Sequence, residues 1–156
     1  MFSAWKTEKA TAALVDEAQA VADRLAGAKP HVVDGYAAAA RLWEASYLAD
    51  GQDLNGLAAW PAARVAKFMT AAQTRIAALR KKREYESSDG LAVWLHTARA
   101  VAEPRIAPAV RAIWGTLMAA GPNADSMAAE WIAEAGLAVD PGRRAPEGFA
   151  PEEGTD

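Results

Sequence analysis

The chain has 156 residues, a net charge of −3 and no cysteine, and about one residue in four is alanine. The absence of cysteine excludes disulfides, thiolate metal sites and cysteine nucleophiles, and it fits a cytoplasmic protein. Alanine loses no side-chain entropy in a helix, so the composition predicts an all-α protein.

Six helices are expected, and the first two are separated by a short turn. The first spans residues 3–27 and carries an apolar stripe at helical spacing, formed by Leu14, Ala18, Val21 and Leu25. The second begins at Pro30 or Asp34 and ends at residues 50–51, where an Asp-Gly pair follows the last apolar position.

The third helix begins at Pro61, and its apolar stripe consists of Val65, Phe68, Ala72, Ile76 and Leu79. Residues 87–90 read Ser-Ser-Asp-Gly, which is typical of a break between helices. We therefore expect the fourth helix to run from Asp89 to about Pro104. The fifth should span about 106–120, and the sixth should run from residue 123 or 126 to about 136.

These elements predict a single compact bundle of five to six helices over residues 1–139. Prolines and glycines recur among charged residues in 140–156, which predicts a disordered Pro/Gly/acidic tail. The charged N-terminus lacks a signal-peptide pattern, and no run of 18 apolar residues occurs. We therefore expect neither a membrane span nor a membrane partner.

Each expected helix carries or adjoins one tryptophan, and six in such a chain are many. The set is Trp5, Trp43, Trp60, Trp94, Trp114 and Trp131. Because small alanine faces allow close helix packing, most of these indoles should be core anchors. One or two of them could instead line a ligand groove or a protein interface, where tryptophan is enriched.

A group of polar and aromatic residues at the start and along one side of the fourth helix is a candidate ligand site. It consists of Tyr85, Asp89, Trp94, His96 and Arg99. A helical projection places His96, Asp89, Arg99 and Glu103 opposite the apolar stripe. This predicts either a solvated face with an ion pair between Arg99 and Glu103 or a polar site for a small molecule or partner.

Residues 54–83 carry seven basic side chains and no acidic one, although the chain as a whole is acidic. Four of them flank the apolar stripe of the third helix: Arg64, Lys67, Arg75 and Lys82. One interpretation is a solvated face, partly neutralised by acidic residues of the first helix or the tail. The other is an anion-facing surface for an acidic protein or, less favoured without interleaved aromatic residues, for nucleic acid.

No arrangement in the sequence predicts a catalytic, metal or cofactor site. Only His31 and His96 are present, and neither follows a glutamate by three residues as in di-iron bundles. Asp89, His96 and Glu103 share a face but are about 10 Å apart along the helix, too far to bind one metal ion. A Gly-x-Ser-x-Gly motif is absent. No known family is indicated.

The sequence favours a non-enzymatic helical interaction or assembly protein that binds a protein partner or itself. A small-molecule-binding bundle with a pocket near Trp94 and His96 is the alternative, and a nucleic-acid-binding protein using the third helix is a weaker one. The preference for arginine over lysine, 11 to 6, is typical of GC-rich bacteria and predicts a bacterial source.

Overall fold

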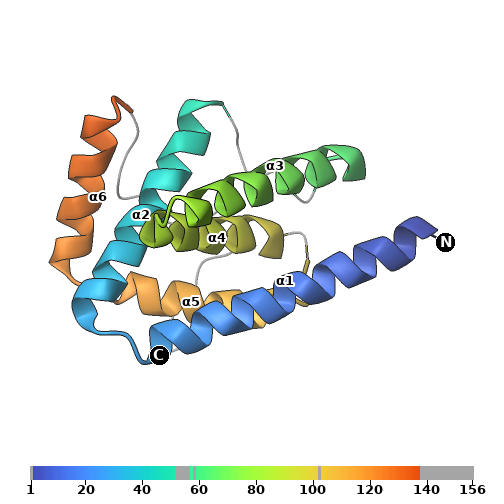
Figure 1. Cartoon of the computed structure of the whole chain (residues 1–156), viewed down its shortest axis with the longest axis horizontal. Coiled ribbons are helices and arrows are strands. Elements are labelled where there is room, and N and C mark those ends of the chain that lie inside the picture. Colours follow the sequence, from blue (N-terminus) through green and yellow to red (C-terminus); the bar gives the residue numbers. More distant parts are fainter. Residues whose placement is uncertain (1, 52–56, 58, 102, 138–156) are drawn as a thin grey trace.

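The protein is an all-α bundle of six helices in the part of the chain that the structure describes (Figure 1). The computed structural model describes residues 2–51, 57, 59–101 and 103–137. The helices are α1 (Phe2–Ala26), α2 (Pro30–Ala49), α3 (Ala62–Lys81), α4 (Tyr85–Ala100), α5 (Ala107–Met118) and α6 (Pro122–Glu134). This confirms the predicted fold class, while the expected tail at 140–156 lies outside the described residues. None of the described helices is long and apolar enough to cross a membrane.

Helix α4 forms the centre of the bundle. It packs against α2, α3, α1 and α5, while α1 also packs along α5 and α6 packs on α2 (Figure 1). All eight residues from Leu91 to Ala98 are buried. Eight consecutive buried residues cover every side of a helix, so α4 is a core helix rather than an amphipathic surface helix. The predicted solvated face of this helix is therefore wrong.

The predicted boundary between the third and fourth helices is also wrong. Helix α3 ends at Lys81, and Arg83 adopts a left-handed φ of 61° before α4 begins at Tyr85. The Ser-Ser-Asp-Gly stretch lies inside α4. A Cβ atom at Gly90 would overlap the Cβ of Ala39 and lie 3.0 Å from its carbonyl carbon. Gly90 thus allows α2 and α4 to cross closely, and it does not interrupt the helix.

The predicted apolar stripes form the core. Along α1, Leu14, Ala18, Val21 and Leu25 are all buried. On α3, Ala72 and Ile76 are buried together with Met69, while Val65, Phe68 and Leu79 pack half-buried against the same core. These contacts confirm the helical phase predicted for both elements.

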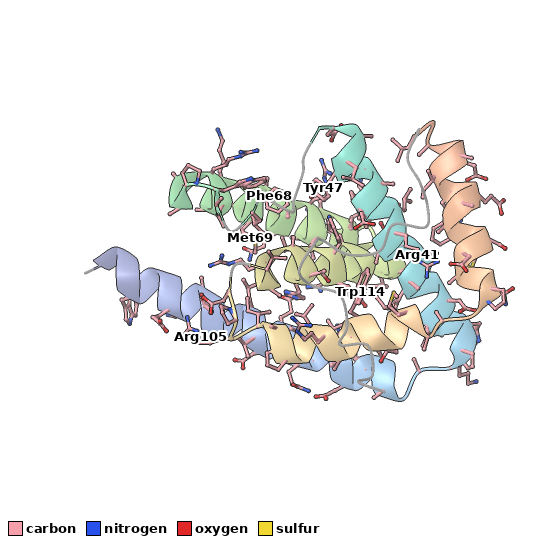
Figure 2. All side chains as sticks on the ribbon, turned by 180° about the vertical axis from the view of Figure 1, so that it is seen from behind. Arg41, Tyr47, Phe68, Met69, Arg105 and Trp114 are labelled. Atoms are coloured by element: carbon pink, nitrogen blue, oxygen red, sulfur yellow. The ribbon has the colours of Figure 1, made fainter. Side chains whose placement is uncertain are left out.

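Two polar contacts attach α6 to α2. A side-chain oxygen of Asp34 accepts a hydrogen bond from the backbone N–H of Gly121 at 3.1 Å, directly before α6 begins. Further along α2, the buried guanidinium of Arg41 donates to Asp125 (Figure 2 labels Arg41). Because both α2 side chains are buried, these contacts satisfy polar groups that would otherwise be costly to remove from water.

The six tryptophans divide by depth. Trp94 and Trp114 are buried core residues, whereas Trp43, Trp60 and Trp131 are half-buried. Trp5 is 59% exposed. The core-anchor prediction therefore holds fully for two of the indoles, whereas all three half-buried ones border open hollows described below.

Candidate functional site

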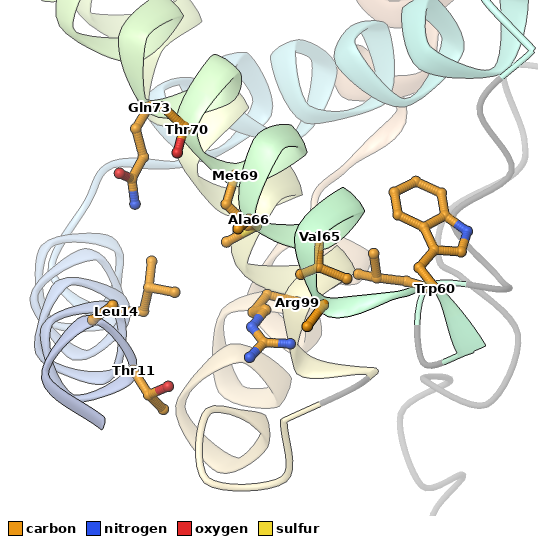
Figure 3. A pocket seen from close by; sticks show the side chains of 12 residues that line it. Thr11, Leu14, Trp60, Val65, Ala66, Met69, Thr70, Gln73 and Arg99 are labelled. Carbon is orange, nitrogen blue, oxygen red and sulfur yellow. The ribbon is translucent and has the colours of Figure 1, made fainter. Parts of the chain in front are cut away.

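A hollow of about 430 Å³ lies between α1 and α3, with α4 beneath it (Figure 3). We call it the α1–α3 hollow. Its walls are mostly apolar, and Leu14, Leu57, Val65 and Met69 are the aliphatic side chains larger than alanine that line it. The remaining lining residues are Ala10, Thr11, Trp60, Ala62, Ala66, Thr70, Gln73 and Arg99.

The helix arrangement explains why this space exists. Helices α1 and α3 both pack on α4 but make little contact with each other. The facing surfaces carry short side chains, Ala10 and Thr11 on α1 and Ala62 and Ala66 on α3, which do not bridge the gap. The hollow therefore lies between α1 and the two consecutive helices α3 and α4, which follow α1 in the chain only after α2.

Arg99 contributes the one cationic side chain among the described residues that line the α1–α3 hollow. It is half-buried, and Figure 3 shows its guanidinium between the Thr11 side of α1 and Val65 of α3. Of the five residues predicted as a ligand site, Arg99 is the one that lines this space. None of the described residues that line it with Arg99 is acidic.

The predicted ion pair between Arg99 and Glu103 does not form. Helix α4 ends at Ala100, so Glu103 is not held one helical turn beyond Arg99. Glu103 instead accepts hydrogen bonds from Arg105, at 3.1 Å from Nε and 3.2 Å from the backbone N–H. These bonds lower the pKa of the Glu103 carboxyl, and the charge of Arg99 adds a smaller effect in the same direction. Arg105 also donates to Glu8 at 2.7 Å.

His96 and Trp94 lie in the core, away from the α1–α3 hollow. His96 is 0% exposed, and neither ring nitrogen has a hydrogen-bond partner within the described part of the chain. Burial lowers the pKa of His96 from 6.5 to about 4; nearby Arg80 lowers it further and Glu17 opposes the shift. His96 is therefore a neutral core residue at pH 7, and neither it nor Trp94 lines the α1–α3 hollow.

Asp89 belongs to a charged network across α1, α3 and α4. Arg80 lies 3.4 Å from Glu17 and 3.5 Å from Asp89, and Arg24 lies 4.0 Å from Asp89. Burial raises the pKa of the Tyr36 hydroxyl, and the negative charge of nearby Asp89 raises it further. Through Glu17 of α1, the network neutralises Arg80, one of the basic side chains of residues 54–83. Partial neutralisation by the first helix was one of the two interpretations of this segment.

Arg64, Lys67, Arg75 and Lys82 are all exposed and form no ion pair with the described residues. Two of them contact tryptophan rings. The guanidinium of Arg64 lies 3.7 Å from the ring centroid of Trp60, and that of Arg75 lies 5.5 Å from the centroid of Trp43. The second contact could not be predicted from local sequence, because Trp43 is on α2 and Arg75 is on α3.

The two tryptophans are the ends of an aromatic row between α2 and α3. Tyr47 lies 6.5 Å from Trp43 and 5.3 Å from Phe68, and Phe68 meets Trp60 edge to face at 5.7 Å (Figure 2 labels Tyr47 and Phe68). Such tilted and edge-to-face arrangements are the favoured ones. The row fixes Trp60 where it borders the α1–α3 hollow.

A second, more open hollow lies where α2, α6 and the start of α4 meet. It encloses about 570 Å³ and is bordered by three aromatic side chains, Trp43, Tyr85 and Trp131. Tyr85 is 57% exposed. The five residues predicted as one ligand site thus lie in four different surroundings, and the structure does not bring them together.

Within the described residues, no three His, Asp or Glu side chains come together in a way that could hold a metal ion. Comparisons of the chain with protein-family models, curated proteins and solved structures found no match. Any function of the chain is therefore inferred from the geometry of the hollows and of the charges around them.

Proposed function

We propose that this protein is a ligand-binding helical bundle that takes a small, largely apolar molecule into the α1–α3 hollow. The observation that supports this proposal best is the hollow itself. Its volume of about 430 Å³ falls in the range of small-molecule sites, which are typically lined by apolar side chains with a few polar groups.

The surroundings of the α1–α3 hollow favour a preformed site. Leu14 and Met69 are anchored in the core, and Trp60 is held by its edge-to-face contact with Phe68. Side chains that are already fixed lose little entropy when a ligand arrives. A ligand with an apolar body would replace water against these side chains.

Octanol is a suitable neutral probe of this proposal. Titration of the methyl-labelled protein with octanol should shift the NMR signals of Leu14, Val65 and Met69, while the signals of Ile132 on α6 stay in place. The absence of any shift at the three lining residues would reject the proposal.

Two alanines of α3 provide a matched pair of variants. Ala66 lines the α1–α3 hollow and Ala71 does not, and both are exposed. Ala66→Phe should fill the hollow and abolish the octanol shifts, whereas Ala71→Phe should retain them. Equal binding by both variants would place the octanol elsewhere and contradict the proposal.

Self-association is the second candidate, supported by the three aromatic side chains around the hollow of α2, α4 and α6. Aromatic residues are enriched at the centres of protein interfaces, and this group includes the exposed ring of Tyr85. Light scattering should then report a dimer that Tyr85→Ser weakens and Trp5→Ser does not. A wild-type monomer at the highest attainable concentration would reject this candidate.

A further inference from the structure

Arg99 places a positive charge at the base of an otherwise neutral, mostly apolar hollow. The side chain leaves α4 between α1 and α3 (Figure 3), and it makes no hydrogen bond or ion pair with a described residue. A half-buried guanidinium without a partner is an uncommon feature, because removing a charge from water is costly unless an opposite charge compensates it.

The nearest candidate for an internal partner is already engaged. Glu103 accepts three hydrogen bonds from Arg105, and Arg105 also donates one to Glu8. Arg105, Glu103 and Glu8 therefore bind one another beside the end of α4. Neither Glu103 nor any other acidic residue is among the described residues that line the α1–α3 hollow. The guanidinium of Arg99 is therefore available to bind an anionic group of another molecule.

The surroundings add to the preference for an anion. Arg64 lies over Trp60 at the edge of the α1–α3 hollow, and residues 54–83 contain no acidic side chain at all. The combined field of these groups attracts a negative charge and disfavours a cationic ligand. Among the described residues, one guanidinium lines the hollow itself, which suits an anion of single charge.

We infer that the ligand of the α1–α3 hollow is a monocarboxylate with an apolar body, an inference that rests on the proposed function. The planar guanidinium of Arg99 can donate two parallel hydrogen bonds to the two carboxylate oxygens. The apolar body then lies against Leu14, Val65 and Met69, which form the walls above Arg99. The ligand thereby supplies the negative charge that Glu103 does not.

The test compares octanoate with octanol, two probes of the same chain length that differ at the head group. Calorimetric titration should give octanoate a Kd about ten- to a hundredfold lower than that of octanol, the range expected for hydrogen bonds between charged groups. Arg99→Gln should remove this preference, so that octanoate and octanol bind with similar Kd values. Arg99→Lys should restore part of it, because lysine keeps the charge but lacks the fork of donors.

Lys82→Gln is the matched control for net charge. Lys82 is exposed and does not line the α1–α3 hollow, so this variant removes one positive charge without touching the site. It should keep the full preference for octanoate. An equal loss in Lys82→Gln and Arg99→Gln would show a general charge effect and overturn the role of Arg99.

The outcomes separate this inference from the proposed function. If wild-type protein binds octanol and octanoate equally well in the α1–α3 hollow, the proposed function stands and the carboxylate inference fails. If neither probe binds, both fail. Persistence of the octanoate preference in Arg99→Gln would also overturn the inference, since another group would then hold the carboxylate.

Discussion

Gly90 of α4 lies against Ala39 of α2 so closely that no side chain fits between the two helices at that point. An added Cβ would overlap the Cβ of Ala39, and it would lie 3.0 Å from the carbonyl carbon of Ala39 and 3.1 Å from the nitrogen of Ala40. Two of these three atoms belong to the backbone, so the contact could be relieved only by moving one helix away from the other.

We expect Gly90→Ala to lower the free energy of unfolding by about 1 to 3 kcal/mol, because overpacking at this crossing outweighs the better helix propensity of alanine. Chemical denaturation would measure the change. Gly35→Ala is the control, since its added Cβ meets only the carboxylate end of Glu86, which can turn away. It should be neutral or stabilising by up to about 1 kcal/mol, and a similar loss in both variants would contradict this account of the crossing.

His96 should make the protein less stable in acid. Its pKa is about 4 in the folded protein and 6.5 when unfolded, so between these values the unfolded chain binds a proton that the folded one does not. The contribution of neutral His96 to the free energy of unfolding is fully present above pH 6.5. As the pH falls toward 4, this free energy decreases by up to about 3 kcal/mol. Denaturation curves measured between pH 7 and pH 4 would show this loss.

The two histidines allow a direct comparison. His96→Leu should flatten the decline of stability between pH 6.5 and pH 4, whereas His31→Leu should leave it unchanged because His31 is exposed. If both variants keep the same acid dependence as the wild type, another group is responsible. Such a result would count against the neutral, buried state of His96.

Replacement of Ile76 by Ala should cost about 2 to 4 kcal/mol of unfolding free energy. Ile76 is 5% exposed in the middle of α3 and belongs to the core cluster. Lys67→Ala on the exposed side of the same helix should change stability by less than about 0.5 kcal/mol. Equal effects at the two positions would mean that the assigned inner face of α3 is wrong.

Removal of residues 140–156 should change the free energy of unfolding by less than about 0.5 kcal/mol. This expectation comes from the sequence, in which prolines recur every five residues among acidic ones. Thermal melting of the chain ending at Val139 would test it. A drop of several degrees, or protection of the Phe149 amide from exchange, would show that the segment docks onto the bundle.

Sequence periodicity was sufficient to predict the helices, but it did not predict where α3 ends and α4 begins. A Ser-Ser-Asp-Gly stretch has the composition of a turn, and only the crossing with Ala39 reveals why Gly90 stands within a helix. His96 was misplaced for a related reason. A projection of one helix shows which residues share a face, but it does not show that neighbours cover all faces, as they do along α4.

The candidate site was only partly predictable. Arg99 was selected from its polar surroundings in the sequence, but Thr11 and Leu14 lie more than 80 residues away and reach the same space through the packing of α1 on α4 and α5. The tryptophan count indicated that some indoles would border a groove, and Trp60 does. Nothing in the local pattern distinguished it from Trp94, because depth is set by the neighbouring helices.

The attachment of α6 through α2 has a consequence for how the molecule opens. Helix α6 buries only Ala124, Ala128 and Ile132 and packs chiefly on α2, so its detachment exposes little apolar surface and leaves the other helices packed together. Regions with little buried apolar surface unfold locally at low free energy while the rest of a domain persists. Amide hydrogens of α6 should therefore exchange earlier than those of α4, and each opening uncovers the face of α2 that carries Arg41 and Asp34.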